Sequence, residues 1–140
     1  MTDQTRIDPD LPRLIEQSLE LLAARVGDPA PLVYDRLFAL QPDALALFVG
    51  DRTGAARGEM LAMVFEVLMD LAAGGATGAN MIRAERVNHD GLGVDPEVFV
   101  SFFGVVAQVV REGAGPDWTP QMDAAWDLLL ARAARVVRES

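Results

Sequence analysis

The stretch His89-Asp90-Gly91-Leu92-Gly93-Val94-Asp95-Pro96-Glu97 lies between two segments of different character. Before it, residues 79–88 have a mixed, weakly apolar pattern that predicts a helix ending near the histidine. After it, Asp95-Pro96-Glu97 predicts the start of a strongly apolar helix through Val109, because Asp caps a helix and Pro suits its first position. The glycines between them are typical of a turn. The stretch therefore predicts two helices joined at a tight bend.

The rest of the chain, read outward from this bend, also has helical signals. Apolar residues recur at steps of three and four, and the strict alternation of a half-buried strand is absent. Gly50 to Gly58 is predicted to be a loop. We expect an all-α protein of six to eight helices, with the other segments at Leu11–Val26, from Asp28-Pro29 to Leu40, the short piece ending at Leu47-Phe48, Leu61–Ala72, and from Thr119-Pro120 to Val137.

Length and composition narrow the function classes. A chain of 140 residues predicts one domain, 1–140, with a polar tail at 1–8. The chain has no Cys and its basic residues are all Arg, which excludes thiolate catalysis, Cys-ligated zinc and lysine Schiff bases. A net charge of −9 disfavours nucleic acid and anionic membranes. Since we see no signal peptide and no apolar run of bilayer length, we expect a cytoplasmic location.

Several motifs with catalytic or binding potential are better explained structurally. Glu66 and Asp70 are one helical turn apart but lie off the apolar stripe, which is typical of a solvated helix face. The segment Gly74–Gly78 follows no strand and precedes no Lys, so it is interpreted as an interhelical loop rather than a phosphate cradle. The segment Asp90–Gly93 lacks the alternating oxygen ligands of a calcium loop.

His89 is the only histidine in the chain. A single His at a helix end is most often a surface or capping residue. Zinc would lack a second His or Cys ligand, whereas haem brings four nitrogen ligands and needs only one axial imidazole. An apolar helical chain with one His therefore points weakly to a haem pocket.

Three patches, in order along the chain, resemble bacterial single-domain globins and the haem domain of flavohaemoglobins. The first runs from Val33-Tyr34-Asp35-Arg36-Leu37-Phe38 through Gln41-Pro42-Asp43 to Phe48. The second is the stretch from His89 to Glu97, and the third is Thr119-Pro120 with Ala125-Trp126. Together they span nearly the whole chain. The resemblance implies a globin fold, a three-over-three helical sandwich around a haem pocket.

The resemblance also implies a set of site residues. His89 would be the axial ligand of the iron of haem b, and Tyr34 would donate a hydrogen bond to a diatomic gas (O2, NO or CO). Arg57 stands where the family usually has a distal Gln or His, so it would contact the haem or the gas ligand. The residues expected to line the haem pocket are Phe48, Leu61, Val94, Phe99 and Phe102. An alternative for Tyr34 is a core phenol bonded to a backbone carbonyl.

Departures from the family pattern leave other functions open. Glu85 occupies a position that usually contacts the porphyrin with an apolar side chain, and the carboxylate that supports the proximal His in flavohaemoglobins is missing. One alternative is a haem-free interaction module, with the cavity filled by Met60, Phe102 and Phe103 and crossed by an Arg57–Glu85 ion pair. Another is an NO dioxygenase working with a separate reductase. A homodimer is also open, since the apolar helix 98–109 could offer a face to a second copy.

Overall fold

The protein is described by a computed structural model in which residues 10–139 are placed. The predicted polar tail, 1–8, lies outside the described residues. Six α-helices and two short 3-10 helices make up the described chain, which contains no strand. Their bounds are α1 Asp10–Val26, α2 Ala30–Leu40, η1 Pro42–Phe48, α3 Ala55–Ala72, α4 Ala76–Gly91, α5 Pro96–Ala114, η2 Gly115–Asp117 and α6 Pro120–Arg138. The predicted all-α class is confirmed.

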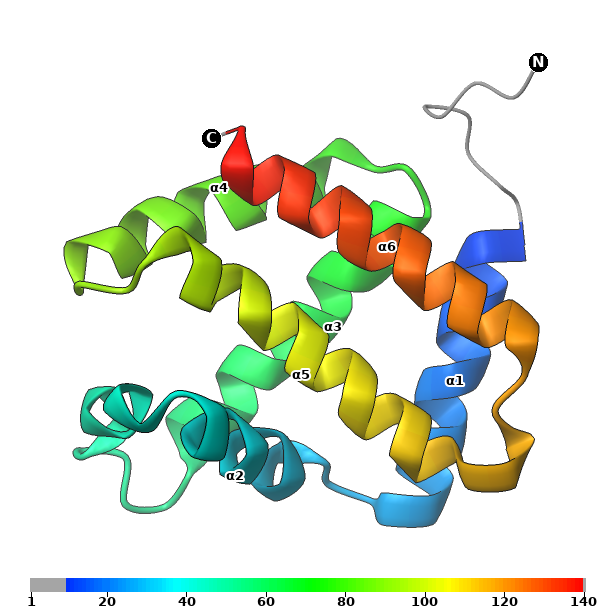
Figure 1. Cartoon of the computed structure of the whole chain (residues 1–140), viewed down its shortest axis with the longest axis horizontal. Coiled ribbons are helices and arrows are strands. Elements are labelled where there is room, and N and C mark those ends of the chain that lie inside the picture. The colour runs from blue at the N-terminus through cyan, green and yellow to red at the C-terminus, as the bar shows by residue number, and fades with distance from the viewer. Residues whose placement is uncertain (1–9, 140) are drawn as a thin grey trace.

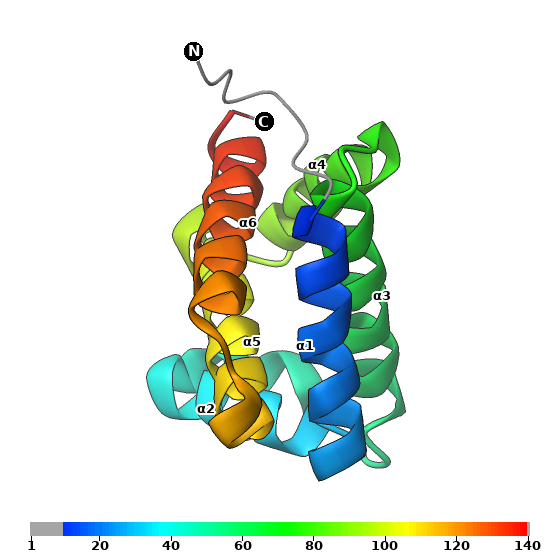
Figure 2. The same ribbon diagram turned by 90° about the vertical axis from the view of Figure 1, so that its right-hand side faces the viewer.

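The helices pack in two layers, which Figures 1 and 2 show from two sides. One layer holds α1, α3 and α4, and the other holds α2, α5 and α6. The helix α5 crosses the centre of the molecule and contacts α1, α2, α4 and α6. This arrangement is the three-over-three sandwich implied by the resemblance, with the cavity described below between the two layers.

The helix α5 is the central core element. Its Asp95 cap accepts a hydrogen bond from the Glu97 amide at 2.8 Å, as the Asp-Pro-Glu signal predicts. The segment Pro96–Asp117 is long and apolar enough to cross a membrane by length and composition, so the expectation of no such run was wrong. In this structure its apolar side chains pack inside the domain, where Val106 and Val110 are fully buried. Part of its apolar surface is therefore covered by the other helices, while Val98, Phe99, Phe102 and Phe103 face the cavity described below.

The two layers are joined by a buried polar contact. The indole Nε1 of Trp126 in α6 donates to the hydroxyl of Ser18 in α1 at 2.9 Å, and that hydroxyl donates to the Ile15 carbonyl at 2.6 Å. Both side chains are buried. Since a buried indole N–H needs an acceptor, Ser18 fixes how α6 lies on α1.

Several expected boundaries differ from the structure, among them the end of α5, which lies at Ala114 instead of Val109. The loop ends at Gly54, because α3 begins at Ala55 instead of after Gly58. The helix α4 runs from Ala76 to Gly91, so His89 lies in its last turn instead of beyond its end. Weakly apolar residues at each end of these helices hide their first and last turns from a periodicity argument.

The start of α4 is held by Asp70. This carboxylate accepts a hydrogen bond from the Gly78 amide, so Asp70 belongs to the α3–α4 contact and its assignment to a solvated helix face was wrong. Gly78 is buried, and a Cβ on it would lie 2.7 Å from the Val67 carbonyl oxygen. Glycine is therefore required here for the close approach of α3 and α4, the two helices on either side of the cavity.

Candidate haem pocket

A cavity of about 470 Å³ lies between α3 on one side and α4 and α5 on the other, with η1 and the end of α2 at its mouth. This volume is within the range of small-molecule and cofactor pockets. Its lining is mainly aliphatic, aromatic and methionine side chains, and its polar lining residues are Gln41, Asp43, Glu85, His89 and Asp95. Met60, Phe102 and Phe103 contribute to the wall without filling the space, so the filled cavity expected of a haem-free module is not found.

His89 lines this cavity from the last turn of α4. Its Nδ1 is 2.7 Å from the backbone carbonyl oxygen of Glu85, one turn earlier, so Nδ1 carries the proton and donates it. No described residue is hydrogen-bonded to Nε2, whose lone pair is then available to a metal. A ligating His typically has its other ring nitrogen held in this way.

One aromatic ring packs beside the imidazole, and further aromatic residues line the cavity wall. The ring of Phe99 lies 5.0 Å from that of His89, centroid to centroid. Phe48 and Phe102 line the cavity further along, and Val94 lines it just after the bend. Four of the expected pocket residues are thus brought together with His89 around one apolar space.

Tyr34 does not line the cavity. Its side chain is buried, its ring packs 5.4 Å from Phe48 and 5.7 Å from Phe102, and its hydroxyl donates to the Arg57 carbonyl oxygen at 3.0 Å. Burial raises the pKa of the Tyr34 phenol above its usual value, although the nearby Arg57 charge opposes this, so the group remains a proton donor. This is the core arrangement left open above, with the ring directly behind the cavity wall.

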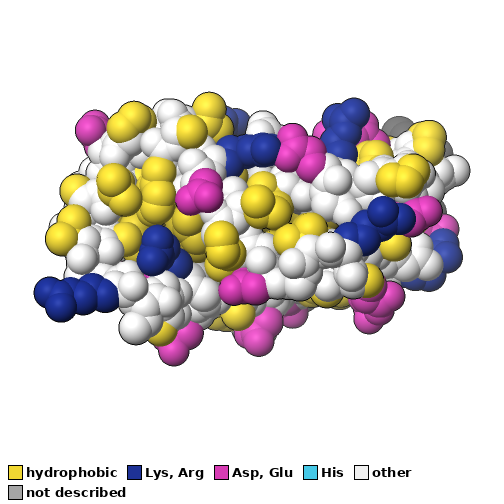
Figure 3. All heavy atoms as spheres, turned by 90° about the horizontal axis from the view of Figure 1, so that it is seen from below, with side chains coloured by type: hydrophobic (Ala, Val, Ile, Leu, Met, Phe, Trp, Pro, Cys, Tyr) yellow, Lys and Arg dark blue, Asp and Glu magenta, His cyan; other side chains and the backbone are white. Residues whose placement is uncertain are grey.

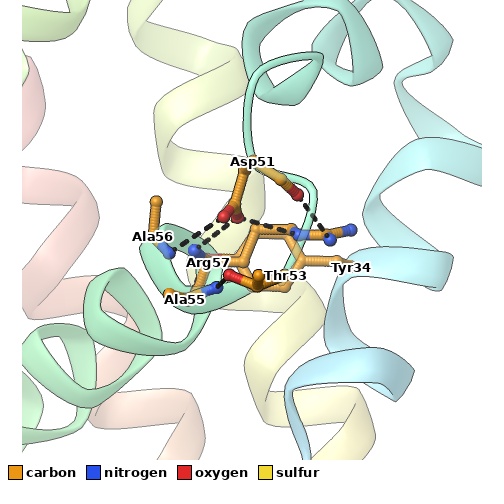
Figure 4. Close-up of polar contacts among 6 residues, drawn as sticks. All are labelled: Tyr34, Asp51, Thr53, Ala55, Ala56 and Arg57. Atoms are coloured by element: carbon orange, nitrogen blue, oxygen red, sulfur yellow. Dashed lines mark hydrogen bonds and ion pairs between the residues drawn. The ribbon is translucent and has the colours of Figure 1, made fainter.

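Arg57 is absent from the cavity lining, and its side chain is held by Asp51 (Figure 4). The guanidinium donates from Nε to the Asp51 carboxylate at 3.1 Å and from a terminal nitrogen to the Asp51 carbonyl at 3.2 Å. Burial alone would raise the pKa of Asp51, but hydrogen bonds from the Arg57 and Ala56 amides and from the guanidinium outweigh it and lower that pKa. The Arg57–Glu85 ion pair expected of a collapsed pocket is not formed.

Leu61 is buried in the core and is absent from the cavity wall. The apolar stripe that predicted α3 marks its core face, and the cavity lies beside the neighbouring face. Sequence reasoning missed most of that second face, although the methionines at 60 and 63 are a signal, because flexible apolar side chains suit an irregular wall. The cavity residues contributed by α3 are Met60, Met63, Val64 and Val67.

Glu85 lines the cavity on the same helix as His89. One of its carboxylate oxygens is 3.7 Å from Nδ1 of His89, and its side chain is about one third exposed. A carboxylate at a position that usually contacts the porphyrin was expected to need a partner or solvent, and here it lies beside the imidazole and is partly exposed. The chain thus places a carboxylate beside the histidine.

The residues present fit a haem at this place. An imidazole with a free Nε2 faces an apolar space of cofactor size, and the mouth leaves one side open to water for charged groups. At the mouth the lining carries Asp43 and Asp95, and none of the described lining residues is Arg. The propionates of a haem would therefore be stabilised chiefly by water.

Exposed apolar side chains gather beside the mouth. Figure 3 shows them over the end of the molecule that carries α2 and η1. They belong to the end of α2 and to η1 and the residue after it, and they are Leu40, Leu45, Leu47 and Val49, of which Leu47 also lines the cavity.

In a comparison with known protein families, the Globin family model matches residues 32–137. No curated protein and no solved structure matches the chain. The matched range begins just before Tyr34 and includes η1, the cavity face of α3, the His89 turn and nearly all of α6. It covers most of the chain and agrees with the two-layer helical packing. The chain belongs to the globin family.

Proposed function

We propose that this protein binds haem b in the cavity between its two helical layers and takes up a diatomic gas reversibly, O2 first and NO or CO as well. The observation that carries the proposal is the state of His89: it faces the cavity with Nδ1 held by the Glu85 carbonyl and Nε2 free. Globins typically bind haem through one such imidazole. A bound haem would supply the iron that takes up the gas, and His89 would hold it.

The chain's own residues would orient the cofactor and exclude water. His89 would hold the iron, with Phe99 and Val94 beside it, while Phe48 and Phe102 pack along the wall. A neutral apolar gas is stabilised in such a dry site, where a single hydrogen-bond donor has a larger effect than in water. Tyr34, the only tyrosine of the chain, packs behind this wall. To reach a gas molecule, its hydroxyl must leave the Arg57 carbonyl.

Arg57 and Leu61 are assigned indirect roles. Arg57 is held outside the cavity by Asp51, and Leu61 supports the wall from the core. Both are one or two turns into α3, so they affect the pocket through the position of this helix. For a homodimer, the exposed patch of Leu40, Leu45, Leu47 and Val49 is the apolar surface that we propose as the interface.

The proposal is tested by cycling the reduced, haem-containing protein between argon, O2 and CO while recording its visible spectrum. We expect each gas to shift the Soret band and argon to restore the starting spectrum. A haem that is bound but gives no shift would show that the axial position is closed. Irreversible oxidation in the first O2 exposure would show that the pocket does not protect the iron.

NO dioxygenation is a second candidate, favoured by the position of Glu85. In that reaction NO, O2 and one electron, delivered by a separate reductase, give nitrate. A carboxylate 3.7 Å from Nδ1 of His89 increases the negative character of the imidazole, which favours oxygen chemistry at the iron. NO consumption that requires both O2 and an added reductase, and that slows in Glu85→Gln, would support this role. The absence of such consumption would restrict the protein to reversible binding.

A further inference from the structure

Asp51 makes more contacts than the capping of a helix requires. It precedes α3 by four residues, and its side chain is 9% exposed. One carboxylate oxygen accepts from the Ala56 amide at 3.1 Å, and the other accepts from the Arg57 amide at 3.0 Å and from Arg57 Nε at 3.1 Å. The first two bonds cap α3, whereas the third restrains a side chain (Figure 4).

Arg57 is placed to reach the cavity when it is not restrained. On α3, Met60, Val64 and Val67 line the cavity, and Arg57 precedes them by three, seven and ten residues. Together with Met63, these residues form the cavity face of α3, and the spacings put Arg57 at the edge of that face, on the side of Val64 and one turn closer to the start of α3. Its side chain instead folds back over Gly54, where a Cβ would lie 3.3 Å from a guanidinium nitrogen.

The helix itself does not favour a cation at this position. The first turn of a helix carries a partial positive charge, so an arginine there is repelled unless an anion compensates. Asp51 supplies that anion. The cavity lining contributed by described residues contains no Arg, so Arg57 is the nearest cation on the α3 face that could serve an anionic group inside.

We propose that Asp51 is a positioning residue for the cavity, which keeps the Arg57 guanidinium away from anionic ligands. By holding Arg57, it also fixes the Arg57 backbone carbonyl that accepts the hydrogen bond of the Tyr34 hydroxyl. The pocket is thereby kept selective for neutral ligands over anions. An anion that entered would have to compete with the Asp51 carboxylate for the guanidinium. The part of this inference that concerns ligands at iron rests on the proposed haem function. The restraint of Arg57 by Asp51 is independent of haem.

Asp51→Asn separates the two roles of the residue. The Asn side-chain oxygen still accepts a bond from a helix amide, but the variant loses the charge that holds the guanidinium. A second variant, Asp51→Asn with Arg57→Gln, removes the released cation. Asp127→Asn on the exposed side of α6 is the matched control for the loss of one negative charge.

The first readout uses the protein as purified and needs no haem. In the wild type we expect the Arg57 Nε–H to give a resolved NMR signal protected from water exchange. In Asp51→Asn this signal should exchange at least about tenfold faster, while the Asp127→Asn protein keeps it protected. An unchanged exchange rate in Asp51→Asn would overturn the proposal, because the carboxylate would not be restraining the side chain.

The second readout is azide binding to the ferric, haem-containing protein, followed by the Soret shift. Asp51→Asn should bind azide about fivefold more tightly than the wild type, the effect of one partly solvated charge pair. The added Arg57→Gln substitution should remove this gain. Two results would contradict the proposal: tighter azide binding that persists after Arg57→Gln, and unchanged azide binding in Asp51→Asn although the Arg57 Nε–H exchanges faster. Either would mean that Asp51 does not control azide binding through the guanidinium. If the protein takes up no haem, the proposed function is wrong. The NMR measurement still tests whether Asp51 restrains the Arg57 side chain.

Discussion

Nδ1 of His89 and the backbone carbonyl of Glu85 form a 2.7 Å hydrogen bond within the last turns of α4. Because donor and acceptor belong to one helix, the orientation of the imidazole follows the position of α4 as a whole. That position depends on the contact of α4 with α3, where Asp70 accepts from the Gly78 amide. The geometry of the proposed iron ligand is thus set more than two helical turns away from it.

Gly78→Ala tests this dependence. A Cβ there would lie 2.7 Å from the Val67 carbonyl oxygen, which is backbone and cannot turn aside. We expect a loss of about 1–3 kcal/mol in the free energy of unfolding, measured by urea denaturation. Because α4 must shift to relieve the clash, haem uptake should also weaken.

Gly91→Ala is the matched control on the same helix. A Cβ at Gly91 meets nothing within 4 Å, and its backbone does not need a positive φ. We expect a stability within about 0.5 kcal/mol of the wild type. If the two alanine variants lose the same stability, the close α3–α4 approach is not what Gly78 provides.

Ser18→Ala removes the only side-chain acceptor that the structure gives to the indole of Trp126. Both residues are buried, so the N–H would remain without a partner. We expect a cost of about 1–3 kcal/mol, seen as a lower midpoint in thermal or urea unfolding. An unchanged midpoint would mean that the indole finds another acceptor inside the core.

Tyr34→Phe has two measurable consequences. Loss of the bond to the Arg57 carbonyl should cost about 1 kcal/mol of stability. In the haem-containing wild type, the hydroxyl would leave the neutral Arg57 carbonyl and donate to bound O2, which is more negative. The variant cannot make this bond, so its O2 dissociation should be about fivefold faster. Stopped-flow displacement of O2 by CO measures this rate. An unchanged rate, together with the stability loss, would restrict Tyr34 to the core role that its hydrogen bond has here.

The depressed pKa of Asp51 makes its contribution to stability depend on pH. A carboxyl whose pKa is lower in the folded state stabilises the protein above its unfolded pKa of about 3.9. This stabilisation is lost as the pH falls through the folded value. The wild type should therefore be more stable than Asp51→Asn at pH 7, and the difference should shrink below about pH 4. Urea unfolding of both proteins between pH 3 and pH 7 checks it, and a constant difference would contradict the assigned bonds.

The helices were predictable from the sequence because each has a boundary signal or a regular apolar face. Asp95-Pro96-Glu97 and Thr119-Pro120 mark the starts of α5 and α6, and both caps form as expected. The missed first turns, Ala55–Gly58 and Ala76–Gly78, are rich in Ala and Gly and carry neither signal, and the last turn of α5, after Val109, was missed as well. The capping of α3 by Asp51 comes from the loop before the helix, and it depends on the shape of that loop, which periodicity does not detect.

The site was predictable in part. His89, Phe48, Val94, Phe99 and Phe102 were expected around the pocket and line one cavity. The side chain of Arg57 could not be placed from its position alone, because the partner that turns it away precedes it by six residues in a loop of unpredicted shape. Hydrogen-bond partners in loops depend on backbone geometry, which spacing along the chain does not give.

The most direct test of the account is a haem titration of the purified protein compared with His89→Gly, followed at the Soret band, with far-ultraviolet circular dichroism as the check on folding. The account predicts that the wild type saturates at one haem per chain, that His89→Gly folds but loses tight uptake, and that added imidazole restores it by occupying the vacated position. Equal affinity and an identical spectrum in His89→Gly, or a folded wild type that takes up no haem, would contradict it.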